Sequence, residues 1–205
     1  MNRKPTVIFE DEALVVINKP AGITVNKSET TIHEGTVQDW VEERYPDLYR
    51  GDDDFSKRAG IVHRLDKETS GILIIAKTPE AFTEMQRQFK ERIVKKTYLA
   101  LAHGKIVPPE GEINVPVGRL EFNRKRFGVV AGGRESVTHY KVLDSGVLSK
   151  GKNKEVLSFV ELYPKTGRTH QIRVHLKHLN HPIFSDMLYA GRKTARDDRK
   201  LLPRV

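Results

Sequence analysis

One carboxylate in the sequence lies where a reactive group could be partly shielded from water. Asp66 sits in residues 63–71, between two short apolar runs, 59–62 and 72–76, which are rich in β-branched residues and predict buried strands. A carboxylate at the rim of a buried strand pair has an altered affinity for protons, which is useful in nucleophilic or acid–base chemistry. The same composition is also typical of an ordinary turn between strands, and by local pattern alone the turn is favoured.

Three side chains elsewhere in the chain could complete a site around this aspartate. They are Tyr98, Arg168 and Arg173, with Arg64 close to Asp66 in sequence. An aspartate, a tyrosine and an arginine suffice for covalent or acid–base chemistry at a sugar or an activated ring. Burial would raise the pKa of the aspartate and weaken it as a nucleophile, whereas a nearby arginine would keep it ionised.

Signatures of several other chemistries are missing from the sequence. It contains no GxGxxG, Walker, GxSxG or HExxH motif, and no cysteine, which excludes disulfides, thiolate catalysis and cysteine-ligated zinc. Four histidines crowd one region (His170, His175, His178 and His181), but no two of them stand four residues apart. We therefore expect neither a metal nor a cofactor.

Composition indicates a soluble, basic globular protein. The 205 residues suit one domain, and the net charge of +9 with a pI of about 9.7 favours a polyanionic partner such as nucleic acid. A generically basic cytosolic protein is the plainer interpretation. No apolar run approaches the roughly 20 residues of a membrane span, and the N-terminus lacks a secretory signal, so we expect a cytoplasmic protein.

Hydrophobic periodicity predicts the elements that would position these residues in the first half of the chain. Residues 7–17 predict a tight hairpin, and residues 36–45 predict a helix capped by Thr36. A second helix begins at Thr78, with a buried stripe formed by Phe82, Met85, Phe89 and Ile93.

The second half of the chain is predicted to be mostly strands. We expect strands over residues 97–102, over 113–117, and over 137–143 and 156–163, with a mobile loop at 145–154. A helix capped by Thr169 follows, with an apolar stripe of Ile172, Leu176 and Leu179. Eight strands and three helices in this order predict an α+β fold with a largely antiparallel sheet.

Five segments resemble, in order, the motifs of the RluA-type pseudouridine synthases. Residues 63–73, HRLDKETSGIL, resemble the family's signature. The others are 18–22 (NKPAG), 96–100 (KTYLA), 166–175 (TGRTHQIRVH) and 181–191, which begins with HPI and ends with LYAG. The resemblance implies a pseudouridine synthase fold, a mixed sheet flanked by helices with a central RNA-binding cleft, spanning residues 1–205 as a single catalytic domain.

The resemblance also implies an activity and the roles of individual residues. It implies a monomer that converts specific uridines in structured tRNA or rRNA to pseudouridine without a cofactor. Asp66 is then the catalytic carboxylate, which adds to the flipped uridine at C6 or at C1′ or assists a glycal route. Tyr98 stacks on the base and serves proton transfer, and Arg173 pairs with Asp66. The expected RNA or base contacts are Arg64, which fills the gap left in the RNA stack, Leu65 and Ile172, which line the base pocket, and Lys19 and Arg168.

The sequence departs from the family pattern in two places. Phe184-Ser185-Asp186 stands where the family has Val-Gly-Asp, which puts the backbone shape of that loop in doubt. The family also continues past Val205 with a helix and strand, so the chain is expected to be short of these. An N-terminal S4 domain is absent too, so the catalytic domain is expected to select its own RNA.

Two other functions compete with this interpretation. A non-catalytic RNA-binding module on the same fold would need none of Asp66, Tyr98 and Arg173. A carboxylate-based glycosidase would need a second carboxylate, and Glu68 is adjacent in sequence without an evident reason to face the same site.

Overall fold

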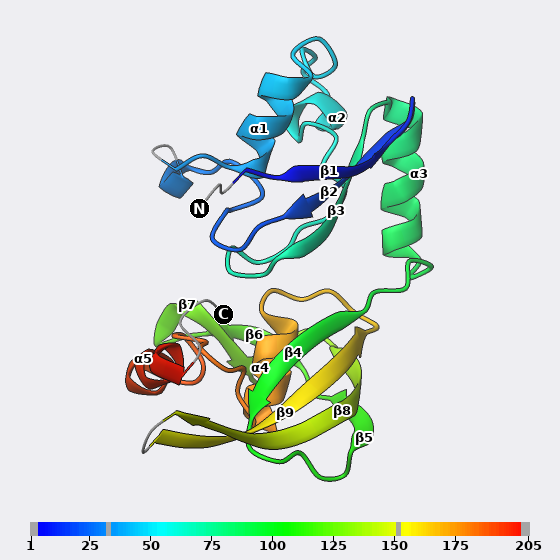
Figure 1. Ribbon diagram of the computed structural model, residues 1–205. Helices are drawn as coiled ribbons and strands as arrows, with labels where there is room; N and C mark the ends of the chain where they lie inside the picture. The colour runs from blue at the N-terminus through cyan, green and yellow to red at the C-terminus, as the bar shows by residue number, and fades with distance from the viewer. Residues whose placement is uncertain (1–3, 32–33, 151–152, 202–205) are drawn as a thin grey trace. The chain divides into compact units, whose positions relative to one another are not determined.

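The computed structural model describes residues 4–31, 34–150 and 153–201. Backbone contacts divide the chain into two compact units, Met1–Val94 and Lys95–Val205. Each combines helices with antiparallel strands (Figure 1), which confirms the predicted α+β class. The assignment of the whole chain to one catalytic domain stays a prediction.

The first unit contains a three-stranded antiparallel sheet in the order β1-β2-β3. Its strands are β1 (Thr6–Glu10), β2 (Leu14–Lys19) and β3 (Gly71–Ala76). The predicted hairpin is confirmed as β1–β2. Along β2, Val15 and Ile17 are fully buried and lie opposite Ile75 and Leu73 of β3, so alternate residues give the sheet an apolar face.

Helices of the first unit begin where the sequence provides caps. They are the 3₁₀ turn η1 (Glu29–Thr31), α1 (Val37–Arg44), α2 (Asp54–Lys57) and α3 (Pro79–Lys90). Thr36 and Asp39 form a capping box at α1, and the Thr78 side chain accepts from the backbone N–H of Ala81 at α3, as predicted. Ile93 is 52% exposed because α3 ends before it, so its predicted burial is wrong.

The predicted strand at residues 59–62 is replaced by a turn. Ala59 and Gly60 both have positive φ, +47° and +65°, and only Ile61 pairs, in an isolated bridge to Ile75. A Cβ on Gly60 would lie 2.0 Å from the carbonyl oxygen of Ala76, so this close approach requires glycine. The backbone therefore bends toward β3 instead of extending beside it.

The second unit contains a four-stranded antiparallel sheet in the order β4-β9-β8-β5 and a separate ribbon β6-β7. The strands are β4 (Tyr98–His103), β5 (Glu110–Asn114), β6 (Val117–Leu120), β7 (Asn123–Val129), β8 (Val137–Lys150) and β9 (Asn153–Pro164). The single strand predicted over 113–117 is wrong: β5 ends before Pro116, which cannot donate to a ladder.

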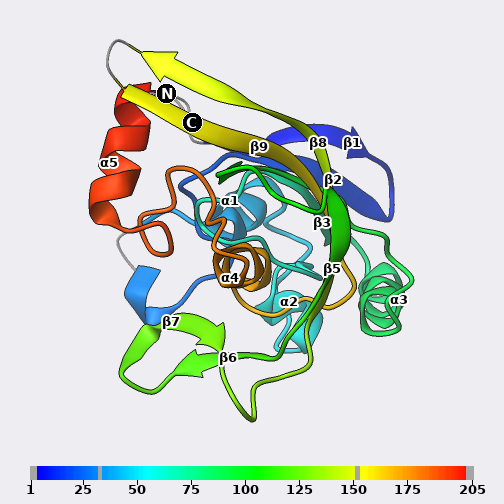
Figure 2. The same cartoon turned by 90° about the horizontal axis from the view of Figure 1, so that it is seen from below.

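The mobile loop predicted over residues 145–154 is also wrong. β8 and β9 stay paired from Thr138 and Pro164 out to Lys150 and Asn153, with a bulge after Val142. Figure 2 shows this hairpin as a long ribbon, and α5 (Arg192–Leu201) packs against β8. Residues 151–152 of the predicted loop lie outside the described residues.

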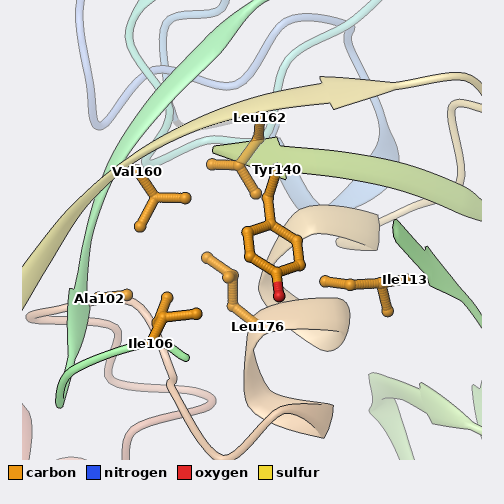
Figure 3. Close-up of a cluster of buried hydrophobic side chains, with 7 residues drawn as sticks. All are labelled: Ala102, Ile106, Ile113, Tyr140, Val160, Leu162 and Leu176. Carbon is orange, nitrogen blue, oxygen red and sulfur yellow. The ribbon is translucent and has the colours of Figure 1, made fainter. Parts of the chain in front are cut away.

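The helix α4 (Gln171–His178) covers the sheet of the second unit and encloses its core. Figure 3 shows Leu176 of α4 directed at the sheet residues around it. The cluster comprises Ala102, Ile106, Ile113, Tyr140, Val160, Leu162 and Leu176. Ile172 and Leu179 pack against it, which confirms the predicted stripe. The cap is not Thr169 but His170, with φ of +57° and no side-chain cap bond, so the chain enters α4 through a left-handed turn.

Candidate active site

Asp66 lies half-buried on the loop between the Ile61 bridge and β3. His63 fixes the start of this loop: its Nε2 accepts the backbone N–H of Ile74 at 3.0 Å, and its ring stacks on Phe89 with centroids 4.6 Å apart. The backbone N–H of Thr69 donates to the carbonyl of Asp66 at 3.1 Å and closes a turn. Contacts with β3 and α3 therefore hold the loop that presents Asp66.

Lys19 fixes the same loop from its other side. Its side chain is 0% exposed, and Nζ donates to the carbonyls of Pro20, Ile23 and Lys67 at 3.0, 2.9 and 3.1 Å. The carbonyl of Lys67 also accepts the backbone N–H of Gly22 at 2.7 Å. One buried ammonium thus joins the 20–23 turn to the residue that follows Asp66.

The environment of Lys19 bears on its predicted role. Burial lowers the pKa of its ammonium to about 8, while the charges of Glu68 and Asp66 act in the opposite direction. An ammonium has three protons to donate, and these three carbonyls match that number. An RNA contact by Lys19 stays a prediction, and the geometry supports a positioning role instead.

The two residues before Asp66 differ in exposure. Arg64 is exposed, and Leu65 is buried. This alternation directs the guanidinium of Arg64 toward solvent and the Leu65 side chain inward. Their predicted places in the RNA stack and the base pocket stay predictions.

Tyr98 and Ile172 border the same apolar core in the second unit. Tyr98 is the first residue of β4, pairs with Leu162 of β9, and packs with Ile172 against the cluster shown in Figure 3. Both side chains are half-buried. Their predicted contacts with the flipped base stay predictions.

Gln171, which the sequence did not single out, holds the loop that carries Arg168. Its buried amide accepts at Oε1 from the backbone N–H of Arg168 (3.0 Å) and from the Thr166 hydroxyl (2.7 Å). Its Nε2 donates to the carbonyl of Val137 at 3.0 Å. Arg168 itself donates from Nε to the carbonyl of Glu135 at 3.1 Å. A buried amide needs partners for both its donor and its acceptor. The sequence does not show that Gln171 is buried, so this role could not be predicted from it.

Arg173 is held in a fork by Asp186. Its Nε donates to Oδ2 at 2.7 Å and its Nη2 to Oδ1 at 3.0 Å, and the two side chains are 17% and 6% exposed. The guanidinium also lies 4.9 Å from the ring centroid of Tyr189. The predicted pairing of Arg173 with Asp66 stays a prediction. Asp186 had no predicted role, although its place three residues before Tyr189 in a matched segment was a signal.

Opposing effects set the charge of Asp186. Burial raises the pKa of its carboxyl, but Arg173 and the backbone N–H groups of Leu188 and Tyr189 outweigh burial and hold the pKa below its ordinary value. Asp186 therefore stays ionised and keeps the Arg173 guanidinium oriented.

The loop at residues 184–186 keeps a backbone shape that suits glycine, although Ser185 stands at the glycine position of the family pattern. Its φ is +64°, the left-handed region that glycine favours, and Phe184 before it is buried. The backbone therefore makes a left-handed turn here even though the residue carries a side chain.

Across residues 4–31, 34–150 and 153–201, no group of three His, Asp or Glu side chains is placed to hold a metal ion. In those same residues, no helix has the length and apolar character needed to cross a membrane.

The chain is similar in sequence to known proteins. The model of the RNA pseudouridylate synthase family matches residues 13–178. Ribosomal large subunit pseudouridine synthase D of Neisseria meningitidis serogroup B is 42% identical over 186 residues, which are 90% of this chain and 46% of that protein. The uncharacterized RNA pseudouridine synthase YhcT of Bacillus subtilis is 40% identical over 90% of this chain and 57% of its own length.

A solved structure resembles the chain as well. Human RNA pseudouridylate synthase domain containing 1 matches with a TM-score of 0.74 and 29% identity, over 96% of this chain and 74% of that one. The chain spans about half the length of the curated relatives that it matches. By the family model and the solved fold together, the chain belongs to the RNA pseudouridylate synthase family.

Proposed function

We propose that this protein isomerises selected uridines to pseudouridines in RNA of the large ribosomal subunit. The observation that carries the proposal is the family match over residues 13–178, which include Asp66, Tyr98 and Arg173. The name of the Neisseria relative states a ribosomal large subunit activity and supports the choice of RNA. Transfer RNA is the second candidate, and the net charge of +9 suits either polyanion.

The proposed reaction balances without any other reactant. The N1–C1′ bond of uridine breaks, the uracil turns within the site, and a C5–C1′ bond forms. The proton on C5 is then lost, and N1 ends with a proton. Because the product is an isomer, no redox cofactor or energy donor takes part.

Asp66 is the proposed catalytic carboxylate. It adds at C6 of the base or at C1′ of the ribose, or it assists a glycal route. Arg173 keeps it ionised by pairing with it, and Asp186 orients Arg173 through the bidentate fork. Tyr98 stacks on the uracil, and its hydroxyl serves proton transfer at the sugar.

The remaining residues serve base flipping and retention of the detached uracil. Extruding a base costs a few kcal/mol, and Arg64, exposed beside Asp66, offsets part of this by filling the vacated place in the RNA stack. Leu65 and Ile172 line the base pocket, and Arg168 binds RNA. Lys19 keeps the Asp66 loop in place. We expect the protein to act as a monomer in the cytoplasm.

Tritium release distinguishes the proposed activity from a binding module. Large-subunit rRNA and tRNA, each labelled with [5-³H]uridine and lacking the modification, are incubated with the protein. We expect release from rRNA to exceed release from tRNA. Tritium release only from tRNA would identify tRNA as the substrate in place of rRNA. Binding of both RNAs without release would favour the non-catalytic RNA-binding module.

A further inference from the structure

The turn that orients Arg173 is made by a residue that does not favour it. Ser185, with φ of +64°, directly precedes Asp186, the partner of Arg173. A left-handed residue with a side chain costs free energy that glycine does not incur, so neighbouring contacts must hold it. The position of Asp186 depends on whatever supplies those contacts.

Asp198 makes the shorter of two hydrogen bonds between α5 and Ser185. It lies on α5 and is 3% exposed, and its Oδ2 accepts the backbone N–H of Ser185 at 2.7 Å. Arg199, the next residue, approaches the Ser185 hydroxyl at 3.4 Å. The left-handed turn is thus held to α5 by a buried carboxylate.

His103 in turn holds Asp198. Its Nε2 lies 3.1 Å from Asp198 Oδ2 and its Nδ1 lies 2.9 Å from Glu155 Oε1, and the residue is 9% exposed. The two ring nitrogens of His103 therefore bridge the carboxylates of Asp198 and Glu155. The ring also lies 5.5 Å from that of Phe184. The contacts of His103 and of the Ser185 backbone N–H with the same oxygen, Oδ2, fix the Asp198 carboxylate beside the turn.

We propose that Asp198, fixed by His103, is a positioning residue for the Arg173 guanidinium, acting through the turn at Ser185 and Asp186. The expected effect on turnover rests on the proposed function. The orientation of Arg173 rests only on hydrogen bonds within the second unit. A functional side chain keeps its productive geometry when neighbouring residues fix it by packing and hydrogen bonds. Asp198 on α5 thus stabilises a positive φ at Ser185 that glycine would adopt without such a contact.

The activity test compares Asp198→Ala with Asp197→Ala, a matched change at the next residue of α5, whose carboxylate bridges Lys200 at the surface. At a temperature where circular dichroism shows every variant folded, we expect Asp198→Ala to lower kcat about tenfold, with KM within about twofold, because small misplacements of a catalytic group cost rate. We expect Asp197→Ala to match the unmodified protein.

A rescue separates positioning from general loss of structure. Adding Ser185→Gly to Asp198→Ala gives the turn a residue that adopts positive φ freely, so kcat should return to within about threefold of the unmodified protein. An unchanged kcat in Asp198→Ala, or a folded double variant that stays slow, would overturn the proposal.

A spectroscopic readout keeps this test separate from that of the proposed function. The Arg173 Nε–H resonance, assigned by its loss in Arg173→Lys, should exchange slowly with water in the unmodified protein and faster in Asp198→Ala, with recovery in the double variant. These changes would support the positioning role even if no RNA released tritium. Identical exchange in all three proteins would contradict it.

Discussion

Asp186 grips the guanidinium of Arg173 through two nearly parallel hydrogen bonds, of 2.7 and 3.0 Å. An arginine that is to keep a catalytic carboxylate ionised must itself be oriented, because a guanidinium on a mobile side chain loses entropy when it pairs. The fork, the ring of Tyr189 and the backbone N–H groups that hold Asp186 meet this requirement within the second unit.

Asp186→Asn should destabilise the protein by about 2–4 kcal/mol, because it removes the charge of the carboxylate that forms the bidentate ion pair with the half-buried Arg173. Urea unfolding followed by circular dichroism measures the free energy of unfolding. Asp47→Asn is the control, since Asp47 and its partner Arg50 are both largely exposed. A loss no larger than that of the control would show that the fork contributes little.

His175 should make stability depend on pH between about 6.5 and 4. Burial lowers the pKa of its imidazole to about 4, with the charge of His178 acting in the same direction and the backbone of Val115 opposing it. The unfolded chain therefore takes up this proton more readily, so the contribution is complete above pH 6.5 and falls by about 3 kcal/mol toward pH 4.

Urea unfolding at intervals from pH 7 to pH 4 measures this dependence, and His175→Gln removes the titrating group. We expect a flatter profile in the variant, whatever its absolute stability. Asp186 acts in the same direction but at lower pH: because its pKa is lowered, its contribution to stability is complete above its ordinary pKa and is lost only as the pH falls below that value. Equal slopes in the His175 variant and the unmodified protein would rule out His175 as the source.

Lys19→Met should destabilise the Asp66 loop by about 1–3 kcal/mol, because three carbonyls, that of Ile23 in a buried hydrogen bond, lose the ammonium as a donor. Amide hydrogen exchange at Gly22, which donates to the carbonyl of Lys67, should become faster. Lys57→Met is the control, since that side chain is 61% exposed. Unchanged exchange at Gly22 would mean that other contacts suffice to hold the loop.

Tyr98→Phe should keep stacking on the base but slow turnover by about 10²-fold, since the ring remains and only the hydroxyl is lost. Single-turnover tritium release measures the chemical step, and filter binding measures RNA affinity. A rate equal to that of the unmodified protein would remove the hydroxyl from the mechanism.

The sequence allowed prediction of elements whose signals are local. The capping box of Thr36 and Asp39 and the cap at Thr78 act within one turn of helix, so their geometry follows from spacing alone. The β1–β2 hairpin is equally local. The family motifs placed Asp66, Tyr98 and Arg173 within one matched family model.

Features that depend on distant partners could not be predicted in this way. The polar stretch after Leu143 forms strand because β9 pairs with it throughout, and pairing overrides weak propensity. The entry to α4 through His170 depends on a left-handed backbone that no cap residue announces. Asp186 pairs with the Arg173 side chain, and Asp198 accepts from the backbone N–H of Ser185. Each contact joins residues 13 apart, which sequence spacing does not reveal.

The central claim is that the carboxylate of Asp66 performs the chemistry. Asp66→Asn keeps the side chain's size and removes its charge, and Asp52→Asn is the matched control at an exposed aspartate of the same unit. Tritium release from [5-³H]uridine-labelled rRNA is measured for both variants together with RNA affinity. We predict no release by Asp66→Asn, with RNA affinity and the activity of the control both retained. Release by Asp66→Asn at the rate of the unmodified protein would contradict the account.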